Sequence, residues 1–164
     1  MHGLPCSGKS TYVSKLVAVN NKLVVISYDD EVQEIAKKNG LEYNDLFRSL
    51  LGKELRKEAS KSLEEKINKN IKKCEDIVFD LTNTSFFARK RALSYFENSK
   101  YFKEIHIMPF LDKQEFIERE TIRYEELLKY GIEKSISVSV YDKFAKDYSV
   151  PTEKEGFNRI IEIK

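Results

Sequence analysis

The sequence predicts an α/β protein, a three-layer αβα sandwich with a mostly parallel sheet. Two observations carry this prediction. Short apolar runs alternate along the chain with longer stretches of helical spacing, which is typical of parallel strands joined by helices. A glycine-rich loop also opens the chain and leads directly into a helical pattern. At 164 residues, the chain fits one domain, 1–164, with a single core.

The first half of the chain is expected to hold two strands and the helices between them. The stretch 10–19 has apolar residues at helical spacing, and 23–27 is an apolar run that ends in acids. From 44 to 73, apolar residues recur at every fourth position, which predicts one long helix with a single buried stripe. This stripe comprises Phe47, Leu51, Leu55, Ala59, Leu63, Ile67 and Ile71. The apolar run 77–80 is the second strand.

The second half continues the alternation of helices and strands. The pattern predicts a helix, a strand, two further helices and a closing strand, in the order 85–96, 104–110, 112–130, 138–147 and 159–164. The region around 113–147 is expected to form a helical lid. His106 lies inside a predicted strand with no partner motif, so it is interpreted as a core or surface histidine.

The glycine-rich loop gives the strongest functional signal. Residues 3–10, GLPCSGKS, fit the pattern G-x-x-x-x-G-K-[ST], in which backbone N–H groups surround the phosphates of a nucleotide while the lysine and the hydroxyl complete the site. The alternative is an ordinary glycine-rich turn before a helix. We expect this P-loop to bind ATP, with Mg²⁺ held at the Ser10 hydroxyl. The expected nucleotide contacts in the loop are Gly3, Ser7, Gly8, Lys9, Ser10 and Thr11.

The strand that precedes such a loop is normally the central one of the sheet. Only Met1 and His2 stand before Gly3, so this first strand is expected to be truncated. A missing central strand deprives both of its neighbours of a pairing partner. This predicts lowered stability unless another segment takes its place.

Composition limits the classes of partner. The chain has 29 Lys and Arg against 27 Asp and Glu, a net charge of +2, and so lacks the basic character of proteins that coat long nucleic acids. A short contact with a nucleic-acid end remains open. No apolar run is long enough to span a membrane, so no membrane partner is expected. Cys6 and Cys74 form neither a metal set nor a disulfide framework, which favours a reducing, cytoplasmic location.

Ligands of open parallel sheets bind beyond the carboxyl ends of the strands, where three sets of residues stand out. The first set is Asp29 with Asp30, directly after the strand 23–27. Phosphoryl transfer needs an acceptor hydroxyl held in line and a group that takes its proton, so Asp29 is the candidate general base. The alternative is that these acids cap the helix that follows.

The second set follows the strand 77–80. Asp80 can hold Mg²⁺ through water, together with the Ser10 hydroxyl, or it can orient the acceptor. Thr82 and Asn83 come next and are candidate substrate-binding residues. As an alternative, Thr-Asn before a helix is ordinary N-cap chemistry.

The third set is Arg119 and Arg123, four residues apart and therefore on one face of a predicted lid helix. Arginines brought over a transferring phosphoryl group neutralise its charge, and a mobile lid lets ATP enter first. Arg119 is counted with the ATP-binding residues. Surface ion pairs with Glu115 or Glu126 would explain the same spacing.

Taken in order, the segments GLPCSGKST, ISYDD, FDLTN, RETIR and YSVPTEKEGFNRIIEI resemble the P-loop polynucleotide 5′-kinases, such as the bacteriophage end-healing enzyme and the kinase domain of bacterial RNA-repair proteins. The resemblance covers nearly the whole chain, and its P-x-x-x-E-G-F segment, 151–157, is fairly specific. It implies a P-loop kinase fold and transfer of the ATP γ-phosphate to a 5′-hydroxyl end of RNA or DNA.

The resemblance also implies roles for individual residues. Lys9 and Ser10 would bind the phosphates and Mg²⁺, and Lys9 is counted among the catalytic residues. Asp29 would be the general base. Asp80 would bind the acceptor, and Arg123 would stabilise the transferring phosphoryl group.

One position departs from the family pattern. Where the family has an arginine that binds the phosphate on the 3′ side of the acceptor nucleotide, this chain has Val32, which cannot bind phosphate. Either Arg48, Lys37 or another cation takes its place, or the acceptor is a nucleoside, nucleotide or other small metabolite. An alternative of another class is an ATP-binding switch without useful turnover, which the retained loop, base and arginine argue against.

Overall fold

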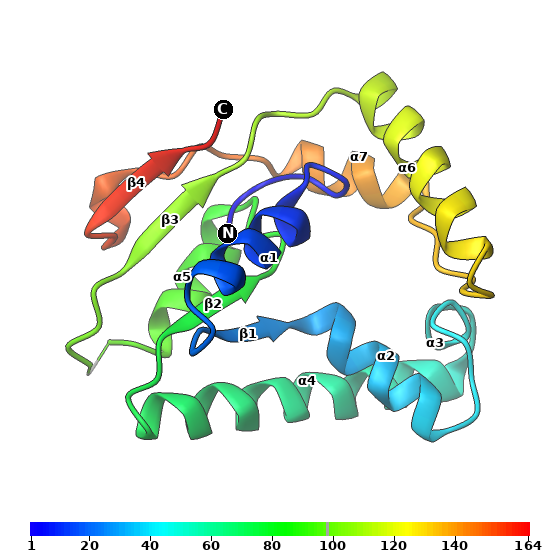
Figure 1. Cartoon of the computed structure of the whole chain (residues 1–164), viewed down its shortest axis with the longest axis horizontal. Coiled ribbons are helices and arrows are strands. Elements are labelled where there is room, and N and C mark those ends of the chain that lie inside the picture. Colours follow the sequence, from blue (N-terminus) through cyan, green and yellow to red (C-terminus); the bar gives the residue numbers. More distant parts are fainter. Residues whose placement is uncertain (98) are drawn as a thin grey trace.

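The computed structural model describes residues 1–97 and 99–164, in which strands and helices alternate and confirm the predicted α/β class (Figure 1). None of the helices within these residues combines the length and apolar character needed to cross a bilayer. In chain order the elements are α1 (Lys9–Val19), β1 (Val24–Ser27), α2 (Tyr28–Lys38), α3 (Asp45–Arg48), α4 (Leu50–Lys72), β2 (Ile77–Asp80), α5 (Phe86–Ser94), β3 (Glu104–Ile107), α6 (Lys113–Leu128), α7 (Val138–Lys146), the 3₁₀ turn η1 (Glu153–Glu155) and β4 (Arg159–Glu162).

The strands of the described residues form two parallel pairs, β1 with β2 and β3 with β4. The N-terminal segment 1–3 lies between these pairs. The His2 N–H donates to the His106 carbonyl over 2.9 Å, and the Gly3 N–H donates to the Thr82 carbonyl over 3.2 Å. The order across the molecule is therefore β1, β2, the N-terminal segment, β3 and β4. In Figure 1, α1 lies in front of these strands and α5 behind them.

Side chains also hold the N-terminal segment in place. His2 is fully buried, and its Nδ1 donates to the Asn83 carbonyl over 2.9 Å. The Asn83 amide donates in turn to the Met1 carbonyl over 3.1 Å. Three residues thus lie where the sequence predicts the central strand, and they give backbone partners to the segments on both sides.

The prediction of one long helix over 44–73 is wrong, because the chain breaks at Ser49. Ser49 is extended (φ −128°, ψ 162°) and its hydroxyl accepts a hydrogen bond from the Gly52 N–H over 2.9 Å, so it caps α4. Gly52 has no space for a side chain, since an added Cβ would lie 2.4 Å from the Leu46 carbonyl oxygen. The break therefore lets α3 fold back closely onto the first turn of α4.

Buried apolar side chains join α2, α3 and α4. Of the predicted stripe, Leu55, Ala59 and Ile67 are buried, whereas Phe47 and Leu51 are exposed. The helix break accounts for Phe47, because it turns the residues before Ser49 out of the line of the stripe, whereas Leu51 lies in the first turn of α4. The cluster consists of Val32, Ile35, Ala36, Leu46, Leu55 and Ala59.

A second cluster joins the P-loop to α6 and α7. Leu4, inside the loop, is fully buried and packs with Leu111, Phe116 and Tyr141. The Tyr141 hydroxyl donates to the Leu111 carbonyl over 2.8 Å, which ties α7 to the start of α6. The helices of the expected lid region 113–147 are thus packed directly against the loop.

A buried ion pair ties α5 to the C-terminal part of the chain. The Arg89 guanidinium is buried, and two of its nitrogens donate to Glu155 of η1 over 2.7 and 2.9 Å. The third nitrogen donates to the carbonyls of Thr84 and Ser149 over 3.1 and 2.8 Å. Glu155 is the glutamate of the P-x-x-x-E-G-F segment, so this part of the motif has a structural role.

Candidate active site

The loop before α1 depends on two glycines. Gly8 caps α1 with a φ of 87°, a conformation that favours glycine. Gly3 has no room for a side chain, because an added Cβ would lie 2.6 Å from Ser7 Oγ and 2.8 Å from Met108 Cβ. Ser7 Oγ is buried and has no hydrogen-bond partner among the described residues. A tight loop with an unpartnered hydroxyl before a helix N-terminus suits an anion such as phosphate.

The Lys9 ammonium turns back into this loop and donates to the Leu4 carbonyl over 2.7 Å. Burial lowers the pKa of Lys9 to about 8, although the negative charges of Asp80 and Asp29 act in the opposite direction. An ammonium that is largely removed from water and bound to a carbonyl would gain from a phosphate ligand.

Ser10 and Thr11 lie in the first turn of α1 and are exposed. Ser10 is the residue after Lys9, and the Asp80 carboxylate is close enough to Lys9 for its charge to act on the pKa of this lysine. A hydroxyl oxygen and carboxylate oxygens are therefore both available near the loop. Oxygen ligands of this kind fit Mg²⁺. The part of the chain that the structure describes holds no group of three or more His, Cys, Asp or Glu that could bind a metal alone. A magnesium ion here would therefore need phosphate oxygens of the nucleotide as further ligands.

The parallel pairing of β1 and β2 brings the predicted acids together. Ser27, the last residue of β1, lies directly opposite Asp80, the last residue of β2, and Asp29 follows two residues later. Both carboxylates act on the pKa of Lys9. Three of the residues predicted from sequence thus meet at the carboxyl ends of two neighbouring strands, where ligands of such sheets bind.

Asp29 lies in the first turn of α2, and both of its carboxylate oxygens have partners. The Tyr43 hydroxyl donates to Oδ1 over 2.9 Å, and the Lys134 ammonium lies 3.1 Å from Oδ2. Burial, together with the charge of Asp29, raises the pKa of Tyr43, so this hydroxyl stays protonated. The alternative that Asp29 or Asp30 caps α2 is wrong, because the Ser27 hydroxyl accepts the Asp30 N–H over 3.2 Å.

Thr82 and Asn83 have structural contacts on the N-terminal segment. The Thr82 carbonyl accepts the Gly3 N–H, and the Asn83 side chain donates to the Met1 carbonyl. The alternative that this dipeptide caps the next helix is wrong, because the cap of α5 is the Ser85 hydroxyl. The predicted substrate contacts of Thr82 and Asn83 stay a prediction.

Arg123 of α6 donates to both oxygens of Glu120 over 2.7 and 2.8 Å. Glu120 is 9% exposed and also accepts the Cys6 thiol over 3.2 Å and the Ile136 N–H over 2.6 Å. Burial disfavours the charged form of Arg123 and so lowers its pKa. The hydrogen bonds and charge of Glu120, together with the charge of Asp29, act in the opposite direction and raise the pKa of Arg123 above its ordinary value. Glu120 therefore connects the P-loop, α6 and the segment after α6.

Among the described residues, neither arginine forms the surface ion pair with Glu115 or Glu126 that was the alternative. Arg123 binds Glu120, and Glu115 closes the capping box of α6 with Asp112. Arg119 lies one turn before Arg123 and is exposed to solvent. Its predicted contact with ATP stays a prediction.

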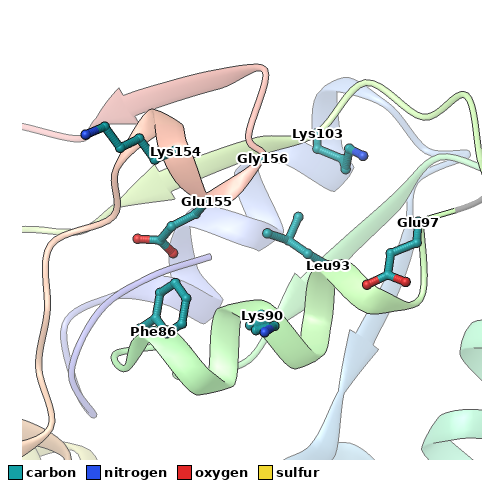
Figure 2. Close-up of a pocket in the computed structure, with 8 residues that line it drawn as sticks. All are labelled: Phe86, Lys90, Leu93, Glu97, Lys103, Lys154, Glu155 and Gly156. Carbon is teal, nitrogen blue, oxygen red and sulfur yellow. The ribbon is translucent and has the colours of Figure 1, made fainter.

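A separate open pocket of about 410 Å³ lies between α5 and η1 (Figure 2). Phe86 and Leu93 line it from α5, and Lys154 and Glu155 line it from η1. Glu155 is already bound to Arg89. The residues that line the pocket include none of the predicted site residues, so this pocket is distinct from the candidate active site.

Sequence reasoning missed three residues of the site: Tyr43, Glu120 and Lys134. Glu120 stands three residues before Arg123, a spacing that places both on one helix face, so the sequence did carry a signal for it. Tyr43 and Lys134 reach Asp29 from distant parts of the chain, and no local pattern marks either of them.

A family model described as an AAA domain, AAA_33, matches residues 1–132. The chain belongs to this family. AAA_33 is a P-loop NTPase and kinase-like family that includes kinases, which agrees with the P-loop kinase-like α/β fold. Membership in AAA_33 implies nucleotide binding, typically with Mg²⁺. No curated protein matches the chain.

Proposed function

We propose that the protein is an ATP-dependent kinase that transfers the γ-phosphate to a 5′-hydroxyl end of RNA or DNA. The observation that carries the proposal is the position of Asp29. Its half-exposed carboxylate lies near enough to Lys9 and Arg123 for its charge to act on the pKa of both. A candidate base, a phosphate-binding lysine and an arginine are thus gathered where a P-loop fold binds its ligands.

Phosphoryl transfer asks a protein for positioning and charge rather than covalent chemistry. Asp29 would accept the proton of the 5′-hydroxyl while the hydroxyl oxygen attacks the γ-phosphorus. The bond between the γ-phosphorus and the β–γ bridging oxygen would break and release ADP. Lys9 and the loop N–H groups would hold the β- and γ-phosphates. Arg123 would bind oxygens of the transferring group. Bound Mg²⁺ would neutralise further phosphate charge, next to the Ser10 hydroxyl and Asp80.

Two cations of this site are held by protein groups. Lys9 donates to the Leu4 carbonyl, and Arg123 donates to Glu120. Phosphate oxygens are stronger acceptors than a carbonyl and fit the guanidinium fork as well as a carboxylate does. ATP would therefore exchange the Leu4 contact of Lys9 for its own as it binds, whereas Arg123 would keep Glu120 and act on the transferring group in the transition state.

A second candidate function is a kinase for a nucleoside, a nucleotide or another small metabolite. Val32 favours it, because this side chain is fully buried in the cluster of α2, α3 and α4 and offers no cation to a polynucleotide phosphate. The small net charge of +2 also suits a small acceptor.

Transfer of labelled γ-phosphate from Mg-ATP to a panel of acceptors tests the proposal. The panel holds 5′-hydroxyl RNA and DNA oligonucleotides, 3′-mononucleotides and free nucleosides. Labelled oligonucleotide that is lost in Asp29→Asn and kept in the neighbouring control Asp30→Asn supports the 5′-kinase. Label on small acceptors only favours the second candidate, and ATP binding without transfer to any acceptor favours an ATP-binding switch.

A further inference from the structure

We propose that Lys134 binds the phosphodiester of the acceptor next to the reacting hydroxyl, an inference that rests on the proposed 5′-kinase function. Lys134 lies on the segment 129–137 that connects α6 to α7, beyond the range 1–132 of the family match. Its side chain is only 14% exposed, although it belongs to a loop that leaves the helices. A lysine so well covered in a surface loop is held by specific contacts.

Three contacts place Lys134 beside the candidate base. Its ammonium lies 3.1 Å from Asp29 Oδ2 and 4.4 Å from the centre of the Tyr43 ring, over which it forms a cation–π contact. Its carbonyl accepts a hydrogen bond from Arg123 over 3.4 Å. The ammonium therefore lies at the carboxylate of the candidate base Asp29, on the same chain segment that contacts the candidate catalytic arginine.

The two contacts of the Asp29 carboxylate indicate what Lys134 does. Tyr43 donates to Oδ1 and Lys134 lies against Oδ2, and the remaining lone pairs of this half-exposed carboxylate are open to a hydroxyl that passes its proton to Asp29. A phosphodiester next to that hydroxyl offers the ammonium a new anionic partner. One acceptor can thus engage the base through its hydroxyl and the neighbouring ammonium through its phosphate, which a nucleoside without phosphate cannot do.

The other positions considered for this role are less well placed. Position 32 faces the core, since Val32 is fully buried. Lys37 and Arg48 are exposed near the ends of α2 and α3, and within residues 1–97 and 99–164 neither forms an ion pair with Asp29. Lys134 has the ionic contact that those residues lack, and its stem lets the ammonium move over a few ångströms.

A comparison of two acceptors that differ only in phosphate tests this role: adenosine 3′-monophosphate and adenosine. In Lys134→Ala, we expect kcat/KM for the 3′-phosphorylated acceptor to fall about tenfold to a hundredfold, because one charge-assisted contact is lost. The kcat/KM for adenosine should fall much less, because adenosine has no phosphate for Lys134 to bind, and the KM for ATP should stay within about twofold in the same assay. Lys134→Arg should retain most of the preference, and rising salt should weaken the preference in wild type only.

Lys129→Ala is the matched control, because it removes an exposed lysine from the same connecting segment. Thermal melts establish that each variant folds, and Lys134→Gln, which keeps most of the length of the side chain, is measured if the alanine variant does not fold. Equal losses on both acceptors, or a higher KM for ATP alone, would overturn the assignment. Wild-type transfer with an unchanged preference in Lys134→Ala overturns this inference alone, whereas wild type without transfer to any 5′-hydroxyl acceptor overturns the proposed function and this inference together.

Discussion

Arg123 donates to both carboxylate oxygens of Glu120, and the same carboxylate accepts the thiol of Cys6 in the P-loop. The arginine proposed to act on the transferring phosphoryl group is therefore oriented by a residue that also contacts the nucleotide loop. Glu120 touches no reacting atom in the proposed chemistry, so it is a positioning residue.

Removal of Arg123 and of its partner should affect turnover to different degrees. We expect Arg123→Ala to lower kcat by about 10²- to 10³-fold with little change in the KM for ATP, because the contact acts mainly in the transition state. Glu120→Gln should lower kcat by about tenfold, with Glu118→Gln on the exposed side of α6 as control. Steady-state kinetics on the best acceptor measures both, and an unchanged kcat in Arg123→Ala would refute the role of this arginine.

Lys9→Met should separate nucleotide binding from folding. Without nucleotide, we expect the free energy of unfolding to stay constant or rise by about 1 kcal/mol, because the variant no longer buries an ammonium. The increase in Tm that Mg-ATP gives the wild type should disappear. Thermal unfolding with and without Mg-ATP checks both effects. ATP stabilisation that persists in Lys9→Met would mean that the nucleotide binds elsewhere.

The Arg89–Glu155 pair should be essential to the fold. Glu155→Ala leaves the guanidinium of Arg89 buried without its carboxylate, and we expect a loss of about 3–5 kcal/mol in unfolding free energy. The double variant Arg89→Met, Glu155→Leu should lose less, because no charge is left buried. Lys113→Ala, which breaks the exposed pair with Asp142, is the control and should show no measurable change. Denaturant unfolding would count against this view if Glu155→Ala matched the control.

His2 should make the fold sensitive to acid. Burial lowers the pKa of His2 from 6.5 to about 4, so the unfolded chain takes up the proton first as the pH falls. Stability should therefore decrease between pH 6.5 and pH 4, by on the order of 2–3 kcal/mol, and this contribution should change little below pH 4. His2→Gln should remove that part of the pH dependence in denaturant unfolding from pH 4 to 7. An unchanged dependence in His2→Gln would assign the effect to other groups.

Local sequence signals were sufficient for the fold class and for part of the site. The P-loop glycines, the acids after each strand and the strand–helix alternation depend on neighbouring residues, and the structure places Lys9, Asp29 and Asp80 together. The break at Ser49 was missed because the four-residue apolar spacing continues through it. Ser49 begins a new helix as the N-cap of α4, a local signal that the apolar spacing does not contain, and Gly52 lets Leu46 pack closely against it.

Long-range contacts were beyond sequence reasoning. Lys134 stands more than a hundred residues from Asp29, and the folding of two helices and a connecting loop brings them together. The N-terminal segment could be expected to leave the sheet incomplete, but its hydrogen bonds to Thr82 and Asn83 depend on three-dimensional proximity. Glu155 lies in a segment that supports the family resemblance, yet its pairing with Arg89 appears only in the structure.

The most direct test of the central claim is end-labelling of one RNA oligonucleotide with Mg-[γ-³²P]ATP. The oligonucleotide is offered with either a 5′-hydroxyl or a 5′-phosphate, and wild type is compared with Asp29→Asn. The account predicts label on the 5′ end of the hydroxyl form only, and a rate about 10²- to 10⁴-fold lower in Asp29→Asn. Equal labelling by wild type and Asp29→Asn, or no labelled RNA under conditions where the wild type binds ATP, would contradict it.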